Sequence, residues 1–151
     1  MAAVVILLAF VFINQIYSNK RLEKRVDTVA TESRADAYTN VGTDLKQELK
    51  PRDAERAFKL AIELDPKGQE QAYLGLAELY RFYMPEKDGE TPAILRSGLL
   101  YEPQDIILLR ALAQYYERTG DIGQARHWYG KIVDYYPGDV PAKRKIEELG
   151  G

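Results

Sequence analysis

The chain has 151 residues, of which 46% are hydrophobic and 29% are charged, and its formal net charge at pH 7 is −2. This size allows one ordinary domain or a small domain with a membrane anchor, and the composition suits a packed core under a charged surface. The absence of cysteine excludes disulfide bonds and thiolate metal sites.

Charge is distributed unevenly along the chain. Residues 1–34 contain five Lys/Arg and three Asp/Glu, which leaves 16 basic and 20 acidic residues in 35–151. Nucleic-acid binding depends on clustered basic side chains, which supply most of the affinity. We therefore expect no nucleic-acid partner.

The N-terminal segment is predicted to be a transmembrane anchor over residues 1–18. Residues 2–13 are apolar without interruption. A helix from Ala2 to Tyr17 would be roughly 24 Å long, against about 30 Å for the hydrocarbon core of a bilayer. A signal peptide and a helix buried in a partner protein are the alternatives. The anchor residues are Val4, Leu7, Leu8, Phe10, Phe12 and Ile13.

A basic cluster after this segment predicts its orientation. Lys20, Arg21, Lys24 and Arg25 follow the apolar run, and such clusters stay on the cytoplasmic side of a membrane. The sequence thus predicts a single-pass membrane protein with its remaining residues in the cytoplasm, with the periplasm or an organelle lumen as the alternative.

Residues 19–34 contain no Gly or Pro and are predicted to continue the helix as a stalk or linker. Leu22, Val26 and Val29 recur at helical spacing and form a narrow apolar stripe. The stripe is consistent with a short coiled-coil seam and, at least as well, with docking onto the first repeat.

Three prolines mark a repeat in residues 35–151. Pro66 and Pro103 lie 37 residues apart, and Pro103 and Pro137 lie 34 apart. A period in the mid-thirties is typical of helical repeat arrays. The predicted units are 35–68, 69–105 and 106–138, followed by a capping helix over 139–149.

The first and third units each predict two helices joined by a tight turn. Asp53–Pro66 (DAERAFKLAIELDP) predicts the second helix of the first unit. In the third unit, Ile106–Tyr116 and Gln124–Tyr135 carry apolar residues at helical spacing, and Gly120 breaks the helix between them. Because neither helix could bury its apolar stripe alone, we expect the pairs to stack.

The middle unit is irregular. Ala72–Tyr83 predicts its first helix and Ala93–Tyr101 a short second one. The residues between them, Met84–Pro92, contain two prolines and a glycine and are predicted to be a lengthened loop. We interpret this loop as surface variation, with a partner contact as the alternative.

These units resemble the tetratricopeptide repeat (TPR). The residues that carry the resemblance in the first unit are Tyr38, Val41, Gly42, Leu45, Ala54, Phe58, Ala61 and Pro66. Those in the third unit are Leu112, Ala113, Tyr116, Gly120, Ala125, Tyr129 and Pro137. The resemblance implies an all-α solenoid of three helix pairs with a C-terminal capping helix, here preceded by the predicted transmembrane helix.

The resemblance also implies a protein partner, bound as an extended segment or a helix in the groove lined by the first helix of each pair. For Tyr73 and Tyr80 a packing role is an equal alternative. The family's site for terminal carboxylates uses Lys and Asn where this chain has Thr39 and Thr43, so we expect that site to be absent. The groove candidates are Asp36, Thr39, Thr43, Lys46, Gln47, Tyr73, Ala77, Tyr80, Arg81, Ile107, Arg110, Gln114, Glu117 and Arg118.

No motif predicts chemistry. His127 is the only histidine, and without cysteine it predicts no metal site, while Trp128 is expected to fill a gap against the cap. The sequence shows no Gly-rich phosphate loop and no nucleophile–base–acid set. We expect no enzymatic activity, no cofactor and no small-molecule substrate.

Together these features predict a membrane-anchored protein–protein interaction scaffold. It would recruit, assemble or stabilise a partner or a membrane complex through its groove, with the N-terminal helix in the lipid bilayer. The alternative is a structural accessory subunit, held in a multi-subunit membrane complex by its transmembrane helix.

Overall fold

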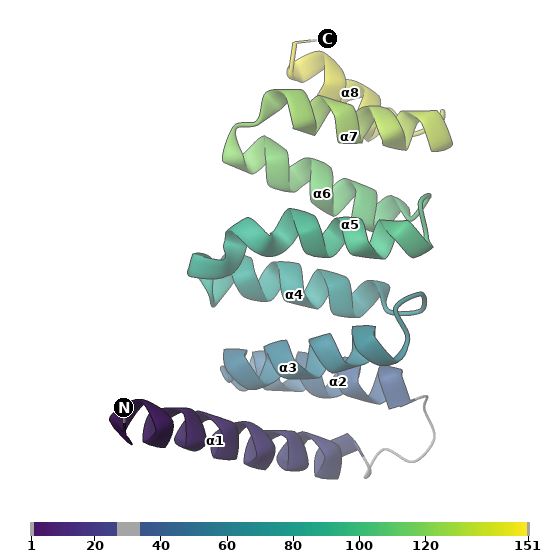
Figure 1. The fold of residues 1–151 in the computed structure, drawn as a ribbon. Helices are drawn as coiled ribbons and strands as arrows, with labels where there is room; N and C mark the ends of the chain where they lie inside the picture. The colour runs from purple at the N-terminus through teal and green to yellow at the C-terminus, as the bar shows by residue number, and fades with distance from the viewer. Residues whose placement is uncertain (1, 27–33, 151) are drawn as a thin grey trace.

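The computed structural model describes residues 2–26 and 34–150, and among them the side chains of 11–23 and 34–150. These residues form a stack of helices, with α1 at one end and α8 at the other (Figure 1). The elements are α1 (Ala2–Val26), α2 (Arg34–Gln47), α3 (Pro51–Leu64), α4 (Glu70–Phe82), the 3₁₀ helix η1 (Pro85–Glu90), α5 (Thr91–Tyr101), α6 (Ile106–Thr119), α7 (Ile122–Tyr135) and α8 (Val140–Glu148).

Side-chain caps define the helices of the C-terminal half. Asp105, Asp121 and Asp139 precede α6, α7 and α8, and their carboxylates accept hydrogen bonds of 2.7 to 3.0 Å from backbone amides of the first turn. These bonds satisfy donors that the helix itself leaves unpaired. Gly120 ends α6 with a φ of 81°, a left-handed conformation that glycine adopts without steric cost.

The core lies between successive helix pairs. Phe58 of α3 is fully buried, and its ring lies against Gly42 of α2 and Gly75 of α4. A Cβ atom at Gly75 would lie 2.5 Å from the nearest ring atom, and one at Gly42 would lie 2.7 Å away. The two glycines therefore let α2, α3 and α4 close around one aromatic ring.

The middle pair departs from the predicted loop. The residues after α4 form η1, and α5 begins at Thr91 with a proline in its first turn. Lys87 of η1 contacts Glu55 of α3 through distances of 2.6 and 2.8 Å. Asp88, the next residue, pairs with Arg118 of α6. The inserted residues thus connect the first helix pair to the third.

The N-terminal helix docks on the first helix pair. α1 runs without a break to Val26 and contacts α2 and α3. Leu22 is fully buried in the first core cluster, the group of apolar side chains that includes Tyr38, Phe58 and Leu76. The Ser18 hydroxyl donates to Asp53 of α3 at 2.9 Å, and Arg21 forms an ion pair with the same carboxylate. Of the apolar stripe only the Leu22 side chain is described, and its contacts agree with docking onto the first repeat; the Val26 side chain and Val29 lie outside the described residues.

The prediction of a transmembrane helix is contradicted. Among the described residues no helix is long and apolar enough to cross a membrane. The prediction of a single-pass membrane protein is corrected on the same finding. In the part of α1 whose side chains are described, Asn14 and Gln15 interrupt the apolar run and charged residues follow from Lys20. Of the anchor residues, Phe12 and Ile13 are exposed, whereas the following side chains lie outside the described ones: Val4, Leu7, Leu8 and Phe10.

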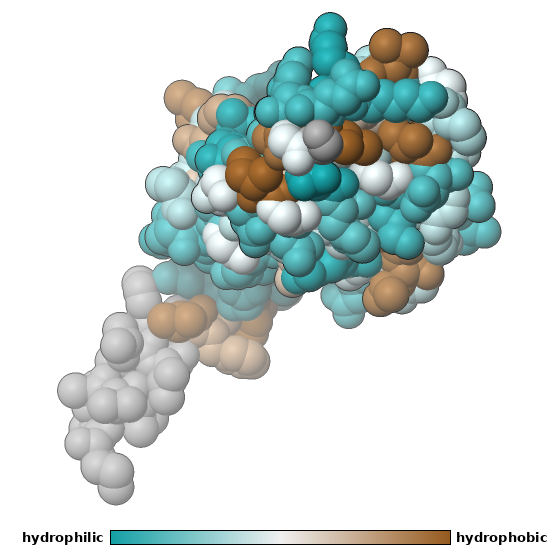
Figure 2. All heavy atoms as spheres, turned by 90° about the horizontal axis from the view of Figure 1, so that it is seen from above, coloured by the Kyte–Doolittle hydropathy of each residue, from teal (hydrophilic) through white to brown (hydrophobic). Residues whose placement is uncertain are grey.

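The upper end of the stack is mostly polar. Figure 2 looks at the molecule from above, and hydrophobic side chains form small separate groups on a largely hydrophilic surface. Ala142 of α8 is fully buried in the second core cluster, the group of apolar side chains that includes Leu112 and Ile132, whereas Val140 is exposed. α8 therefore shields the apolar face of α7, as a capping helix does in repeat arrays.

Replacing Leu22 with alanine is expected to loosen α1 from the array. The substitution removes a fully buried side chain, which costs about 2–5 kcal/mol where the site cannot collapse. Hydrogen exchange should show faster exchange of the α1 amides from Ser18 to Val26, with α4 to α7 unchanged. Glu23→Ala, at an exposed neighbouring position, is the control. Equal exchange in both variants would show that Leu22 does not hold α1.

Candidate functional site

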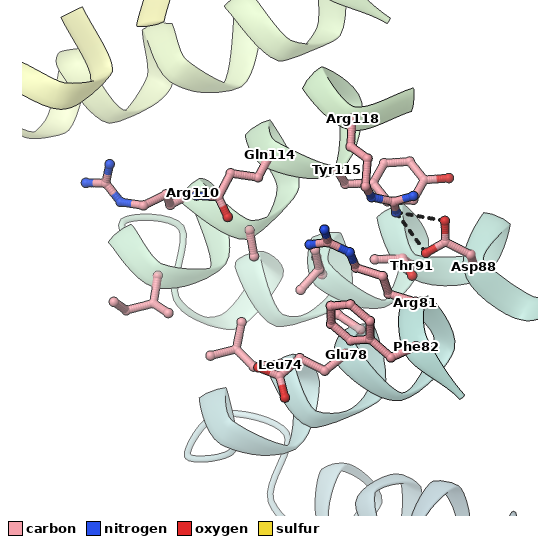
Figure 3. A pocket seen from close by; sticks show the side chains of 14 residues that line it. Leu74, Glu78, Arg81, Phe82, Asp88, Thr91, Arg110, Gln114, Tyr115 and Arg118 are labelled. Atoms are coloured by element: carbon pink, nitrogen blue, oxygen red, sulfur yellow. Dashed lines mark hydrogen bonds and ion pairs between the residues drawn. The ribbon is translucent and has the colours of Figure 1, made fainter. Parts of the chain in front are cut away.

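A pocket opens between α4 and α6, and α5 and η1 complete its wall (Figure 3). We call it the α4/α6 pocket. Its volume is about 270 Å³. Its lining residues are Leu74, Ala77, Glu78, Arg81, Phe82, Asp88, Thr91, Leu95, Ile107, Arg110, Ala111, Gln114, Tyr115 and Arg118.

Helical spacing brings these side chains to one face. On α4 the lining positions 74, 77, 78 and 81 recur every three or four residues, as do 107, 110, 111, 114 and 118 on α6. Residues at this spacing lie on the same side of a helix. α4 and α6 are the first helices of their pairs, so the pocket lies on the face where the sequence predicted the groove.

Most charges around the pocket are paired. The Arg118 guanidinium donates to both oxygens of Asp88, at 2.7 and 3.0 Å, and its carbon lies 5.2 Å from the centre of the Tyr115 ring. Arg110 reaches Asp139 at 2.6 Å. The pKa of the Asp139 carboxyl is lowered, chiefly by the hydrogen bond from the backbone amide of Ala142; burial opposes this, and the hydrogen bond and charge of Arg110 lower the pKa further.

Arg81 differs from the other two pocket arginines. Among the described residues no carboxylate forms an ion pair with it, and its guanidinium carbon lies 4.7 Å from the centre of the Phe82 ring. Glu78, one turn earlier on α4, is already paired with Lys46 at 2.5 Å. In Figure 3 the Arg81 side chain extends past Phe82 toward the middle of the lining residues.

The remaining wall is largely apolar. Leu95 is fully buried, while Phe82 and Ile107 are 63% and 44% exposed. The side chain of Thr91, the first residue of α5, is also part of the lining and is only 3% exposed. Its hydroxyl oxygen has no hydrogen-bond partner among the described residues. The pocket thus combines exposed apolar surface with two polar groups: Thr91, whose hydroxyl has no hydrogen bond, and Arg81, which has no ion pair, within the described part of the chain.

The structure brings some of the predicted groove residues together. Ala77, Arg81, Arg110, Gln114 and Arg118 line the pocket, and so does Ile107. Lys46 lies beside it through its ion pair with Glu78.

Other predicted residues lie elsewhere. Tyr73 and Tyr80 are 2% and 0% exposed, and their hydroxyls donate to the Pro66 carbonyl at 3.1 Å and to Glu55 at 2.7 Å, respectively, so both are core residues. Glu117 accepts hydrogen bonds of 2.7 Å from Tyr129 and from Lys145, which join α6 to α7 and α8.

Apart from Lys46, the predicted residues of α2 are not among those that line the pocket. Thr39 is buried and donates to Gln69, and the Thr43 hydroxyl donates to the Thr39 carbonyl at 3.1 Å. Asp36 accepts a bond of 2.9 Å from Gln69. Gln47 is exposed at the end of α2.

Eight lining residues were not among the sequence candidates: Leu74, Glu78, Phe82, Asp88, Thr91, Leu95, Ala111 and Tyr115. Leu74 and Glu78 follow the same stripe as Ala77 and Arg81, so the spacing along α4 could have identified them. Asp88 could not be identified in this way because it lies in η1, whose path depends on contacts with α3 and α6. Ala111 follows the stripe of α6, and Phe82 and Tyr115 border the two stripes. Thr91 and Leu95 lie on α5, whose position beside the pocket depends on the packing of the middle pair.

No metal site is found in the described part of the chain, where no three His, Cys, Asp or Glu side chains gather suitably. His127 is exposed, and its ring meets Trp128 edge to face at 5.2 Å between centroids. Trp128 is half-buried against the second core cluster, on which α8 also packs.

Comparisons with known proteins identify the fold but not the family. No family model matches the chain, and no curated protein is similar to it. Among solved structures, it is similar to the first TPR domain of the human RPAP3 protein, determined by NMR. The match has a TM-score of 0.60 at 11% sequence identity and covers 76% of this chain and 88% of that domain. The chain therefore has an all-α helical repeat fold that resembles the tetratricopeptide repeat.

Proposed function

We propose that this chain is a protein–protein interaction module that binds a segment of a partner protein in the α4/α6 pocket. TPR-like folds are typically non-enzymatic and act as interaction scaffolds, and the fold supports the same general role here. By binding the segment, the chain recruits its partner or stabilises it in an assembly.

The main support is the composition of the pocket. It exposes Phe82 and Ile107 beside three arginines and Tyr115. Arginine and aromatic side chains contribute a large share of the binding energy in protein interfaces. An apolar partner side chain that covered Phe82 and Ile107 would remove their surface from water, which stabilises a complex by about 25 cal/mol per Å².

The role of accessory subunit is not retained. It required a transmembrane helix to hold the chain in its complex, and the described residues include no helix able to cross a membrane. The proposed module needs only the pocket.

Replacing Ala77 with arginine is expected to abolish partner binding. Ala77 is a half-buried lining residue that forms none of the ion pairs of the pocket, so a long side chain there fills the space that a partner would occupy. Tagged wild-type chain and Ala77→Arg would be purified from the source cells, and the bound proteins would be quantified by mass spectrometry.

Ala93→Arg is the matched control, because Ala93 is exposed on α5 and does not line the pocket. We expect partners to co-purify with the wild type and with Ala93→Arg, and to fall by at least about tenfold with Ala77→Arg. If the same partners remained with Ala77→Arg in equal amounts, the pocket would not be their binding site.

A further inference from the structure

The charges around the α4/α6 pocket leave one positive group without a partner. Arg118 is held by Asp88, Arg110 by Asp139, and Glu78 by Lys46. Only Arg81 has no ion pair among the described residues, although it lies on the wall of the pocket and is exposed. A guanidinium offers five N–H donors in a planar arrangement that matches a carboxylate.

The surroundings of Arg81 favour a carboxylate beside an apolar group. Its guanidinium lies over the Phe82 ring, which restricts its position and leaves its edge free to donate. Leu74, Ala77 and Ile107 form apolar wall close by, and the buried hydroxyl of Thr91 has no partner in the described residues. A volume of about 270 Å³ is below the range of about 300–1,000 Å³ typical of small-molecule sites, so it suits one large side chain better than a complete ligand.

We infer that the α4/α6 pocket selects a partner segment in which an acidic side chain lies next to a bulky apolar one. The acidic side chain pairs with Arg81, and the apolar one enters between α4 and α6. This inference rests on the proposed function, since it describes the segment that the module binds. The segment must contain an internal Asp or Glu, and binding does not require a free chain terminus.

The η1 insertion sets the number of acidic groups that the pocket accepts. On the far side of the pocket both carboxylate oxygens of Asp88 accept from one guanidinium nitrogen (Nη2) of Arg118, so its charge is already paired, as Figure 3 shows. A second acidic side chain would meet Asp88, which repels it. Segments with one acidic residue are therefore preferred to segments with several, because only one guanidinium is free.

The test uses the full chain and a random-sequence peptide library, displayed so that no peptide has a free C-terminal carboxylate. Peptides enriched on the wild type would be synthesised with amidated ends, and their Kd values measured by fluorescence anisotropy. The variants are Arg81→Gln, Asp88→Asn and Ala77→Arg. Arg96→Gln is the control, because Arg96 is exposed on α5 outside the pocket.

We expect the enriched peptides to share an Asp or Glu within about one helical turn of a large apolar residue. Arg81→Gln should weaken their binding about tenfold, and Arg96→Gln should leave it unchanged. Asp88→Asn should strengthen the binding of peptides with two acidic residues about threefold or more, because it releases Arg118. A purely structural role of these residues could not produce this gain.

The two proposals fail in different ways. Peptides that lose binding to Ala77→Arg but show no acidic preference and no response to Arg81→Gln would overturn this inference and leave the interaction module intact. If the enriched peptides bound Ala77→Arg as tightly as the wild type, the pocket would not be the binding site, and both proposals would be wrong. If Asp88→Asn did not fold, Arg81→Gln would still decide, since the exposed Arg81 side chain forms no ion pair in the described residues.

Discussion

Replacing Glu55 with glutamine is expected to lower the free energy of unfolding by about 3 kcal/mol at neutral pH. Glu55 is only 8% exposed and accepts hydrogen bonds from Tyr80 at 2.7 Å, from Lys87 at 2.6 and 2.8 Å, and from Lys59 at 2.8 Å. The substitution removes the negative charge that pairs with the half-buried Lys87 ammonium. Urea denaturation followed by circular dichroism measures the loss.

The same carboxylate makes stability depend on pH. Burial by itself would raise the pKa of Glu55, but the hydrogen bonds from Lys59, Lys87 and Tyr80 outweigh it and lower the pKa from 4.5 to about 2. A pKa that is lower in the folded state stabilises the fold above the unfolded value of 4.5. The stabilisation, at most about 3 kcal/mol, is lost as the pH falls from 4.5 through 2.

The wild type and Glu55→Gln should therefore differ at pH 7 and converge near pH 2. Lys59→Met is the control, because the Lys59 side chain is 53% exposed and exposed ion pairs contribute only about 0–1 kcal/mol. Lys87→Met should cost more than Lys59→Met, since Lys87 joins η1 to α3. A difference between wild type and Glu55→Gln that did not change with pH would contradict this role of the network.

Replacing Phe58 with alanine is expected to cost about 3–5 kcal/mol, which makes it the other large effect. The ring is fully buried between α2 and α4, and its loss leaves a cavity lined by helix backbones that cannot close without moving. Gly75→Ala should cost about 1–3 kcal/mol, because the added Cβ would lie 2.5 and 2.6 Å from two ring atoms. Urea denaturation measures both.

A double-mutant cycle separates packing from helix propensity. Adding Phe58→Leu to Gly75→Ala should recover part of the cost, because the smaller side chain leaves room for the methyl group. Gly130→Ala is the control: a Cβ there meets nothing within 4 Å, so the change should be neutral or stabilising by up to about 1 kcal/mol. If Gly75→Ala were as harmless as Gly130→Ala, the close contact with Phe58 would not constrain the helices.

The repeat fold was predictable because its requirements are local. Gly42, Phe58 and Pro66 stand at the spacing that the TPR resemblance assigns to close helix contacts, to a filling aromatic ring and to a helix end. The solved structure to which the chain is similar confirms the resemblance at the level of the fold. The TPR resemblance also implied that Ala77, Arg81, Arg110, Gln114 and Arg118 face one side of the array, and all five line the α4/α6 pocket.

Helical periodicity was not sufficient for other positions. Each residue turns a helix by about 100°, so a small difference in orientation separates a groove position from a core position. For Tyr73 and Tyr80 the sequence left both roles open, and their burial agrees with the packing role. The apolar run of residues 2–13 predicts a membrane anchor, whereas no helix among the described residues is long and apolar enough to cross a membrane. The contacts of Leu22 and Ser18 with the first helix pair appear only in three dimensions.

The sequence by itself thus determined that the chain forms stacked helix pairs, because this follows from spacing along each helix; its TPR resemblance indicated which face of α4 and α6 is shared. Tertiary structure decided that α1 docks on the array, that η1 joins α3 to α6, and that Arg81 is the pocket arginine without an ion pair in the described residues. These features depend on charges and surfaces from distant segments that meet only when the chain folds. No local sequence pattern specifies that Arg110 and Arg118 form ion pairs with aspartates of other elements.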